Sequence, residues 1–242
     1  MGIRADQVVP LLDGLRKRRS VAAIVLDIES PGGTVTGSDY IHGAAARLAA
    51  DKPLYAFSGE VCASGGYLIA AAARELVVQP AAVVGSIGVI SIRPLAEDLM
   101  RRMGVAVGVT KSGELKDLGA FWRQPTEKEL EKERELVGEY FDLFMDRILA
   151  GRRIAEAKLR ELATGEVFTG RRAVELGLAD RVGSLDDTIT AAADAAGIKP
   201  RRRWYAVRRS LRQRLLGGVT AELGDELVER LSMLAADRRP RA

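Results

Sequence analysis

Glu60-Val-Cys-Ala-Ser-Gly-Gly-Tyr67 is the stretch around which the rest of the sequence is arranged. The apolar run 53–57 before it predicts a buried strand, and the alanine-rich run 68–74 after it predicts a helix. Ser64 therefore falls at a turn from strand to helix, beside two glycines that let another backbone or a substrate approach closely. The N–H groups and dipole at a helix start would stabilise an anion formed there. A serine at this place is also typical of a plain helix N-cap.

Strands and helices alternate along the chain, which is typical of an α/β protein with a mostly parallel sheet. The β-branched run 21–28 predicts a buried parallel strand that ends in the turn Ser30-Pro-Gly-Gly33. Thr126 and Glu129 have the spacing of a helix capping box. Beyond these elements we expect strands at 75–78, 81–90, 105–110 and 178–182, a turn at 167–170, and helices at 5–18, 37–50, 94–103, 126–150, 154–162, 171–177 and 185–196.

The composition is that of a soluble globular protein, with 47% apolar and 29% charged residues among 242. We expect one domain over residues 1–196 and a basic amphipathic tail over residues 197–242. Residues 201–242 carry 11 arginines against 5 acidic residues. This tail is typical of a solvated helix, an oligomer contact or an interfacial membrane helix, and least of a nucleic-acid patch. No apolar run reaches the length of a membrane span, and the first residues lack a signal-peptide core.

Few residues in the sequence are suited to assist a serine nucleophile or to bind a metal. Cys62 is the single cysteine, so no internal disulfide is expected, and no His/Cys cluster suggests a metal site. His42 is the single histidine, and its place in the predicted helix 37–50 is typical of a plain helix residue rather than of a triad base. A lysine can replace histidine as the base when burial lowers its pKa and a serine hydroxyl holds it in place.

Five segments resemble the signal peptide peptidase A family in their order and spacing. That family consists of serine peptidases with a Ser/Lys dyad on a ClpP/crotonase-like fold, and the resemblance spans roughly residues 20–190. The segments are Ser30-Pro-Gly-Gly33, Ala63-Ser-Gly-Gly-Tyr67, Gly85-Ser-Ile-Gly-Val-Ile90, Lys111-Ser-Gly-Glu-Leu-Lys-Asp117, and Gly165-Glu-Val-Phe-Thr-Gly170 followed by Ala173-Val-Glu-Leu-Gly-Leu-Ala-Asp180.

The resemblance implies a role for five residues. Ser64 matches the nucleophile, and Lys116, the lysine directly before the aspartate of its motif, matches the general base. Ser86 matches the serine that hydrogen-bonds to this lysine and orients it. The backbone N–H groups of Gly33 and Gly65 would form the oxyanion hole, because both turns are expected at the same end of a parallel sheet. No metal, nucleotide or other cofactor is implied.

The same resemblance implies a serine endopeptidase that cleaves signal-peptide remnants or other membrane-derived or unfolded peptides with small or apolar side chains. It also implies homo-oligomers, with helix 126–150 or the tail as candidate contacts, and membrane association in a bacterium or archaeon. Family members commonly begin with a membrane-anchor helix and a further strand, whereas this sequence begins with the predicted helix 5–18. Two other functions stay open: an acyl-CoA enzyme of the crotonase-like fold, and a non-catalytic scaffold such as a phage-type head-maturation relative.

Overall fold

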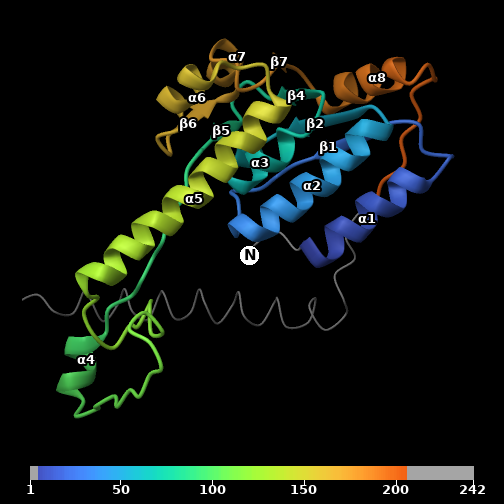
Figure 1. The fold of residues 1–242 in the computed structure, drawn as a ribbon. Helices are drawn as coiled ribbons and strands as arrows, with labels where there is room; N and C mark the ends of the chain where they lie inside the picture. Colours follow the sequence, from blue (N-terminus) through green and yellow to red (C-terminus); the bar gives the residue numbers. More distant parts are fainter. Residues whose placement is uncertain (1–4, 206–242) are drawn as a thin grey trace, which may run out of the picture. The chain divides into compact units, whose positions relative to one another are not determined.

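A computed structural model describes residues 5–205 of the chain (Figure 1). The chain divides into two units, residues 1–202 and residues 203–242, and every helix and strand named below belongs to the first. The tail expected over residues 197–242 lies almost entirely outside the described residues, so its interpretation stays a prediction.

Four strands form an all-parallel sheet in the order β1-β2-β4-β7. β1 (Ile24–Asp27) pairs with β2 (Leu54–Ser58), β2 pairs with β4 (Glu75–Val78), and β4 pairs with β7 (Arg181–Val182). Every residue of β2 is buried, as expected for a central strand covered on both faces. The predicted α/β fold with a mostly parallel sheet is confirmed.

Three short strands form a second sheet. β3 (Val61–Ala63) pairs with β5 (Val83–Gly85) in parallel, and β5 pairs with β6 (Val167–Thr169) in antiparallel orientation. The sequence pattern predicts turns after residues 53–57 and at 167–170, and it gives no sign of β3 or β6. Strands of three residues are too short to show an alternating pattern, so these two elements come only from the structure.

Helices cover both faces of the parallel sheet (Figure 1). α1 (Ala5–Lys17) packs on α2 (Val35–Asp51), and α2 packs on β2 and on α3 (Gly65–Ala70). On the opposite face, α8 (Leu185–Ala195) packs on β1 and β2. The predicted helix 68–74 thus begins three residues earlier and is shorter than expected. Two further short helices are α6 (Glu156–Leu162) and α7 (Gly170–Glu175).

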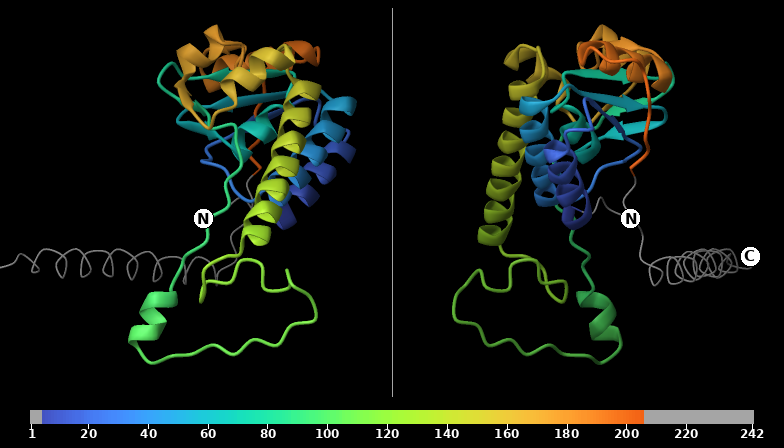
Figure 2. Two further views of the ribbon diagram at one scale, coloured as in Figure 1. Left: turned by 60° about the vertical axis from the view of Figure 1, so that its left-hand side comes forward. Right: turned by 90° about the vertical axis from the view of Figure 1, so that its right-hand side faces the viewer.

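Residues 90–138, which we call the arm, lead away from the two sheets (Figure 2). The arm contains α4 (Glu97–Arg102) and the first half of the 25-residue helix α5 (Glu127–Gly151). α5 begins at the predicted capping box, which is confirmed. The hydroxyl of Thr126 accepts from the Glu129 N–H, and the Glu129 carboxylate accepts from the Thr126 N–H.

The second half of α5 belongs to the core rather than to the arm. Phe144, Met145 and Ile148 are buried there, and α5 packs on α3 and α6. One helix therefore joins two regions with different surroundings: its end is fixed by side-chain packing, and its beginning lies out on the arm.

The strand predicted at 105–110 is wrong, because this part of the arm has no regular secondary structure. Its alternating residues Val105, Val107 and Val109 are each nearly half exposed. A strand needs a neighbour for its backbone N–H and C=O groups, and no strand within residues 5–205 pairs with this segment. The alternating pattern is present in the sequence, but the described part of the chain offers it no pairing strand.

Candidate active site

Ser64 is held in a strained backbone conformation between β3 and α3. Its φ is 50° and its ψ is −122°, a combination that residues other than glycine rarely adopt. The Ser64 N–H donates to the Gly85 carbonyl at 2.8 Å, and the Ser64 carbonyl accepts from the Leu68 N–H at 2.9 Å. The Ser64 side chain makes no capping hydrogen bond. Ser64 therefore precedes a helix without capping it, and the plain N-cap interpretation is wrong.

The turn over residues 30–33 packs directly against Ser64. The carbonyl of Ser30 accepts from the Ala63 N–H at 3.0 Å, which ties the turn to β3. Gly32 has a φ of 119°, and a Cβ placed on it would lie only 2.8 Å from the Ser64 Cβ. Both the backbone conformation and the lack of space require glycine at this position.

The N–H groups of Gly33 and Gly65 border the same space beside Ser64. The Gly33 nitrogen lies 3.3 Å from the point where a Cβ of Gly65 would sit, and the Gly65 nitrogen lies 3.2 Å from the corresponding point of Gly32. Within residues 5–205, neither N–H donates a hydrogen bond. Two unpaired donors beside a serine hydroxyl can bind an oxyanion that forms when the hydroxyl attacks a carbonyl.

The start of α2 borders this space as well as the start of α3. Thr34 caps α2 by accepting from the Gly37 N–H at 3.2 Å. α2 has 17 residues, whereas α3 has only six. The favourable helix dipole expected from the helix after Ser64 is therefore joined by that of α2, which follows Gly33.

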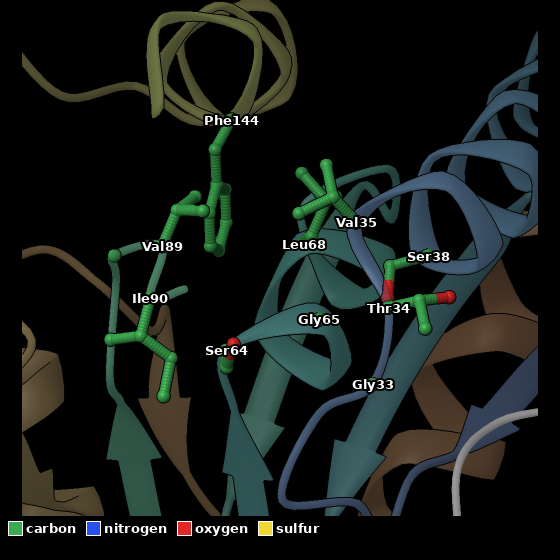
Figure 3. Close-up of a pocket in the computed structure, with 11 residues that line it drawn as sticks. Gly33, Thr34, Val35, Ser38, Ser64, Gly65, Leu68, Val89, Ile90 and Phe144 are labelled. Carbon is green, nitrogen blue, oxygen red and sulfur yellow. The ribbon is translucent and has the colours of Figure 1, made fainter. Parts of the chain in front are cut away.

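Ser64 opens onto a cleft of about 160 Å³ (Figure 3). Its lining residues come from the turn before α2, from both helices beside it, from the chain after β5 and from α5. None of them is titratable, so the described part of the chain places no general base in the cleft. The apolar walls suit an apolar side chain and comprise Val35, Leu68, Val89, Ile90 and Phe144.

Ser86 lies beside Ser64, on the neighbouring strand. It directly follows Gly85, whose carbonyl receives the Ser64 N–H. Ser86 also has a positive φ of 50°, and its own N–H donates to the Glu166 carbonyl at 2.7 Å. Two strained serines therefore stand at the ends of adjacent parallel strands.

Lys116 lies in the arm, and its side chain is exposed. The adjacent Asp117 pairs with Arg123 at 2.8 Å, and Arg123 pairs with Glu129 at 2.6 Å, which ties this loop to the first turn of α5. Phe144, at the cleft, follows Glu129 by 15 residues of the same helix, about 22 Å along its axis. In the described conformation, Lys116 does not reach the cleft of its own chain.

The charged groups around Lys116 keep this loop in shape. Hydrogen bonds from Lys111 and then Arg123 lower the pKa of Asp117 to about 2. Hydrogen bonds from Arg123 and from the Thr126 backbone lower the pKa of Glu129 to about 2. Both carboxylates therefore stay ionised near neutral pH, as partners of cations within the arm.

His42 is buried in α2 and does not line the cleft. Burial lowers its pKa, the nearby Arg147 lowers it further, and Asp39 opposes the shift. Within residues 5–205, no group of three or more His, Cys, Asp or Glu side chains is placed to hold a metal ion. No helix in the same range combines the length and apolar character needed to cross a bilayer.

Ser38 is a residue of this site that sequence reasoning missed. It lies in the first turns of α2, lines the cleft, and is only 2% exposed. The signal was present but weak: a small polar residue sits five positions after the second glycine of Ser30-Pro-Gly-Gly33, in the helix that follows. Serine is common near helix starts, so its type alone does not single it out.

Comparison with known proteins relates the chain to peptidases. The profile of peptidase family S49 matches residues 46–199. A Synechocystis protein named "Putative protease slr0021" is 35% identical over 184 residues, which cover 76% of this chain and 66% of that protein. The chloroplastic serine protease SPPA of Arabidopsis thaliana is 30% identical over 227 residues (93% of this chain, 34% of that protein). Protease 4 of Salmonella typhi is 34% identical over 199 residues (81% and 32%). The matched part thus spans between about a third and two thirds of these relatives.

Proposed function

This chain belongs to peptidase family S49, and on that premise we propose that it is a serine endopeptidase whose nucleophile is Ser64. One observation carries the proposal. A strained serine that caps no helix stands at an apolar cleft, beside two backbone N–H groups that donate no hydrogen bond within residues 5–205. A structural serine needs neither the strain nor the unpaired donors, whereas acyl transfer uses both.

The proposed chemistry follows the usual two steps of acyl transfer. The Ser64 Oγ bonds to the peptide carbonyl carbon, and its proton passes to a general base while the carbonyl π electrons move onto oxygen. The N–H groups of Gly33 and Gly65 hold that oxyanion. The C–N bond then breaks as the base returns the proton to the leaving amine, and water hydrolyses the acyl-enzyme by the same route.

In the proposed enzyme Lys116 is the base, and it comes from a second copy of the chain. Two observations support this. Residues 5–205 place no titratable side chain in the cleft, and the arm that carries Lys116 exposes a row of apolar side chains that nothing in the same range covers. An apolar surface of this kind is expected to dock on another protein. The exposed residues include Ile90, Ile92, Leu95, Leu99, Met103, Val105, Val107, Val109 and Phe121.

Docking would also prepare Lys116 for its role. An amine enclosed beside an apolar cleft loses hydration, and loss of hydration favours the neutral form that can accept a proton. In this proposal Ser86, which follows the strand beside Ser64, holds that amine by a hydrogen bond. The proposal therefore makes the active site complete only in an oligomer.

The substrates we propose are signal-peptide remnants or other membrane-derived or unfolded peptides. The cleft walls are apolar and the space is small, which favours small or apolar side chains next to the scissile bond. Membrane contact through the tail is part of this proposal and concerns residues outside those described.

The test is labelling with a fluorophosphonate probe, which reacts with activated serines, from about pH 6 to about pH 10. We expect labelling of the wild type that rises with pH, and none of Ser64→Ala or Lys116→Ala. Lys128→Ala is the matched control, because Lys128 is an exposed lysine of the arm that forms an ion pair with Glu114 at the surface. Labelling that persists in Ser64→Ala, or a folded wild type that never labels, would contradict the proposal. Acyl-CoA turnover that survives Lys116→Ala would favour the crotonase-like alternative.

A further inference from the structure

Ser38 carries a hydroxyl that is buried at the cleft without a hydrogen-bond partner. Its side-chain oxygen accepts and donates no hydrogen bond within residues 5–205. Burying an unpaired hydroxyl is destabilising. Either Ser38 is a packing defect, or its hydroxyl forms a hydrogen bond with a molecule that binds in the cleft.

The direction of the Ser38 side chain separates these two explanations. A serine or threonine inside a helix commonly satisfies its hydroxyl on the carbonyl four residues earlier. Two residues of α8 do so: the Thr188 hydroxyl donates to the Ser184 carbonyl at 2.8 Å, and the Thr190 hydroxyl donates to the Asp186 carbonyl at 2.9 Å. Ser38 leaves this option unused and turns its oxygen toward Gly65 (Figure 3).

The Ser38 oxygen lies against Gly65, on the side where the Gly33 nitrogen also lies. A Cβ built on Gly65 would overlap the Ser38 Oγ, and the same point is 3.3 Å from the Gly33 nitrogen. The hydroxyl and the Gly33 N–H therefore face one small space beside Gly65. A third neutral donor thus borders the region already proposed to bind the oxyanion.

We infer that the Ser38 hydroxyl is a third hydrogen-bond donor of the oxyanion hole, an inference that rests on the proposed function. As the Ser64 Oγ bonds to the peptide carbonyl carbon, the π electrons of the carbonyl move onto its oxygen. The Ser38 O–H donates to that oxygen and keeps its proton throughout. The bond is strongest on the oxyanion, because charge strengthens a hydrogen bond, and it accounts for a hydroxyl left unpaired when the cleft is empty.

The test compares Ser38→Ala with Ser58→Ala. Ser58 is the matched control because its hydroxyl is also fully buried and unpaired within residues 5–205, yet it lies in β2 and does not line the cleft. We expect Ser38→Ala to lower kcat on a peptide substrate by about 10²-fold to 10³-fold, with little change in KM. Its melting temperature should be equal to or above that of the wild type, because an unpaired buried hydroxyl is lost. Ser58→Ala should hydrolyse the peptide like the wild type.

The pH dependence of kcat separates an oxyanion donor from a residue that orients the base. A donor that never exchanges its proton leaves the pH profile of Ser38→Ala parallel to that of the wild type, and a shifted profile would overturn the inference. Unchanged kcat in Ser38→Ala, with hydrolysis still lost in Ser64→Ala, would overturn this inference and leave the proposed function standing. A loss of kcat that accompanies a lower melting temperature would assign Ser38 a structural role. If the wild type itself hydrolyses no peptide, the proposed function fails, and this inference fails with it.

Discussion

The cleft around Ser64 and the arm that carries Lys116 are stabilised in different ways. At the cleft, main-chain segments pack directly on one another. Ser64 is held by main-chain hydrogen bonds through both its N–H and its carbonyl, and glycines occupy positions where a side chain would not fit. The arm has exposed apolar side chains and is held in shape mainly by ion pairs, such as Arg123 with Asp117 and Glu129. The first region is complete within one chain, whereas the second has an apolar surface that nothing within residues 5–205 covers.

This difference separates the two halves of the proposed dyad. The proposed nucleophile and oxyanion donors belong to the cleft, and the proposed base belongs to the arm, whose apolar surface nothing within residues 5–205 covers. An isolated chain would therefore hold a formed but inactive cleft, and assembly would supply the missing base. Substitutions in the arm should therefore impair assembly and activity together, whereas substitutions in the cleft should impair activity alone.

The largest expected effect comes from charges placed on the apolar surface of the arm. Leu99→Asp combined with Met103→Asp should leave the fold of the chain intact, because both side chains are exposed. It should reduce the assembly to a single chain of 26.1 kDa and lower the rate of probe labelling by about 10²-fold to 10⁴-fold, the usual contribution of a general base. Light scattering and labelling on the same samples check this. A variant that becomes monomeric and stays fully active would contradict the proposal that a second copy supplies the base.

A methyl group on Gly32 should damage the cleft without affecting assembly. Gly32→Ala forces a side chain onto a φ of 119° and to within 2.8 Å of the Ser64 Cβ, which displaces the nucleophile and the neighbouring Gly33 N–H. We expect labelling to slow by about 10²-fold while the particle mass is unchanged. Gly14→Ala, at a helical position with nothing within 4 Å, is the control and should label normally. Wild-type labelling in Gly32→Ala would contradict the described packing.

Two glycines of α5 test the contrast between core and arm within a single helix. At Gly151 a Cβ would overlap the carbonyl of Ala71, whereas at Gly138 it meets nothing within 4 Å. Gly151→Ala should destabilise the protein by about 1–3 kcal/mol through overpacking. Gly138→Ala should stabilise it by about 0.5–1 kcal/mol through helix propensity. Denaturant unfolding measures both, and equal effects at the two positions would contradict the division of α5.

The smallest expected effect is a loss of the stability that ion pairs give the arm as the pH falls. The pKa values of Asp117 and Glu129 are both lowered to about 2 by their partners. Stabilisation from a carboxylate with a lowered pKa is fully present above its unfolded value, about 4, and is lost as the pH falls through its folded value, about 2. The melting-temperature difference between wild type and Arg123→Met should therefore be present at about pH 6 and shrink between about pH 4 and pH 2. A difference that grows in acid would refute this assignment.

The sequence predicts the layered fold well, because long apolar strands and amphipathic helices leave clear periodic patterns. It also singles out Ser64, Ser86, Gly33 and Gly65, which the structure brings to one place. It does not reveal β3, whose three residues carry no pattern of their own and whose pairing depends on contacts distant in sequence.

The separation of Lys116 from the cleft was beyond sequence reasoning for a different reason. The spacing of motifs along a chain says nothing about which copy of the chain completes a site. The same holds for residues 105–110, where a β pattern occurs although no strand within residues 5–205 pairs with it. Ser38 escaped notice because its unpaired hydroxyl is a property of packing, not of residue type.

Mixing the two inactive variants tests the central claim most directly. Ser64→Ala and Lys116→Ala are each expected to be inactive, and they would be dissociated, combined in equal amounts and reassembled. If Lys116 of one copy serves Ser64 of another, random mixing restores about one quarter of the sites. Each restored site combines Ser64 from a Lys116→Ala chain with Lys116 from a Ser64→Ala chain. Probe labelling and peptide hydrolysis would then return toward that fraction. Mixed assemblies that stay inactive, or activity in Lys116→Ala alone, would contradict the account.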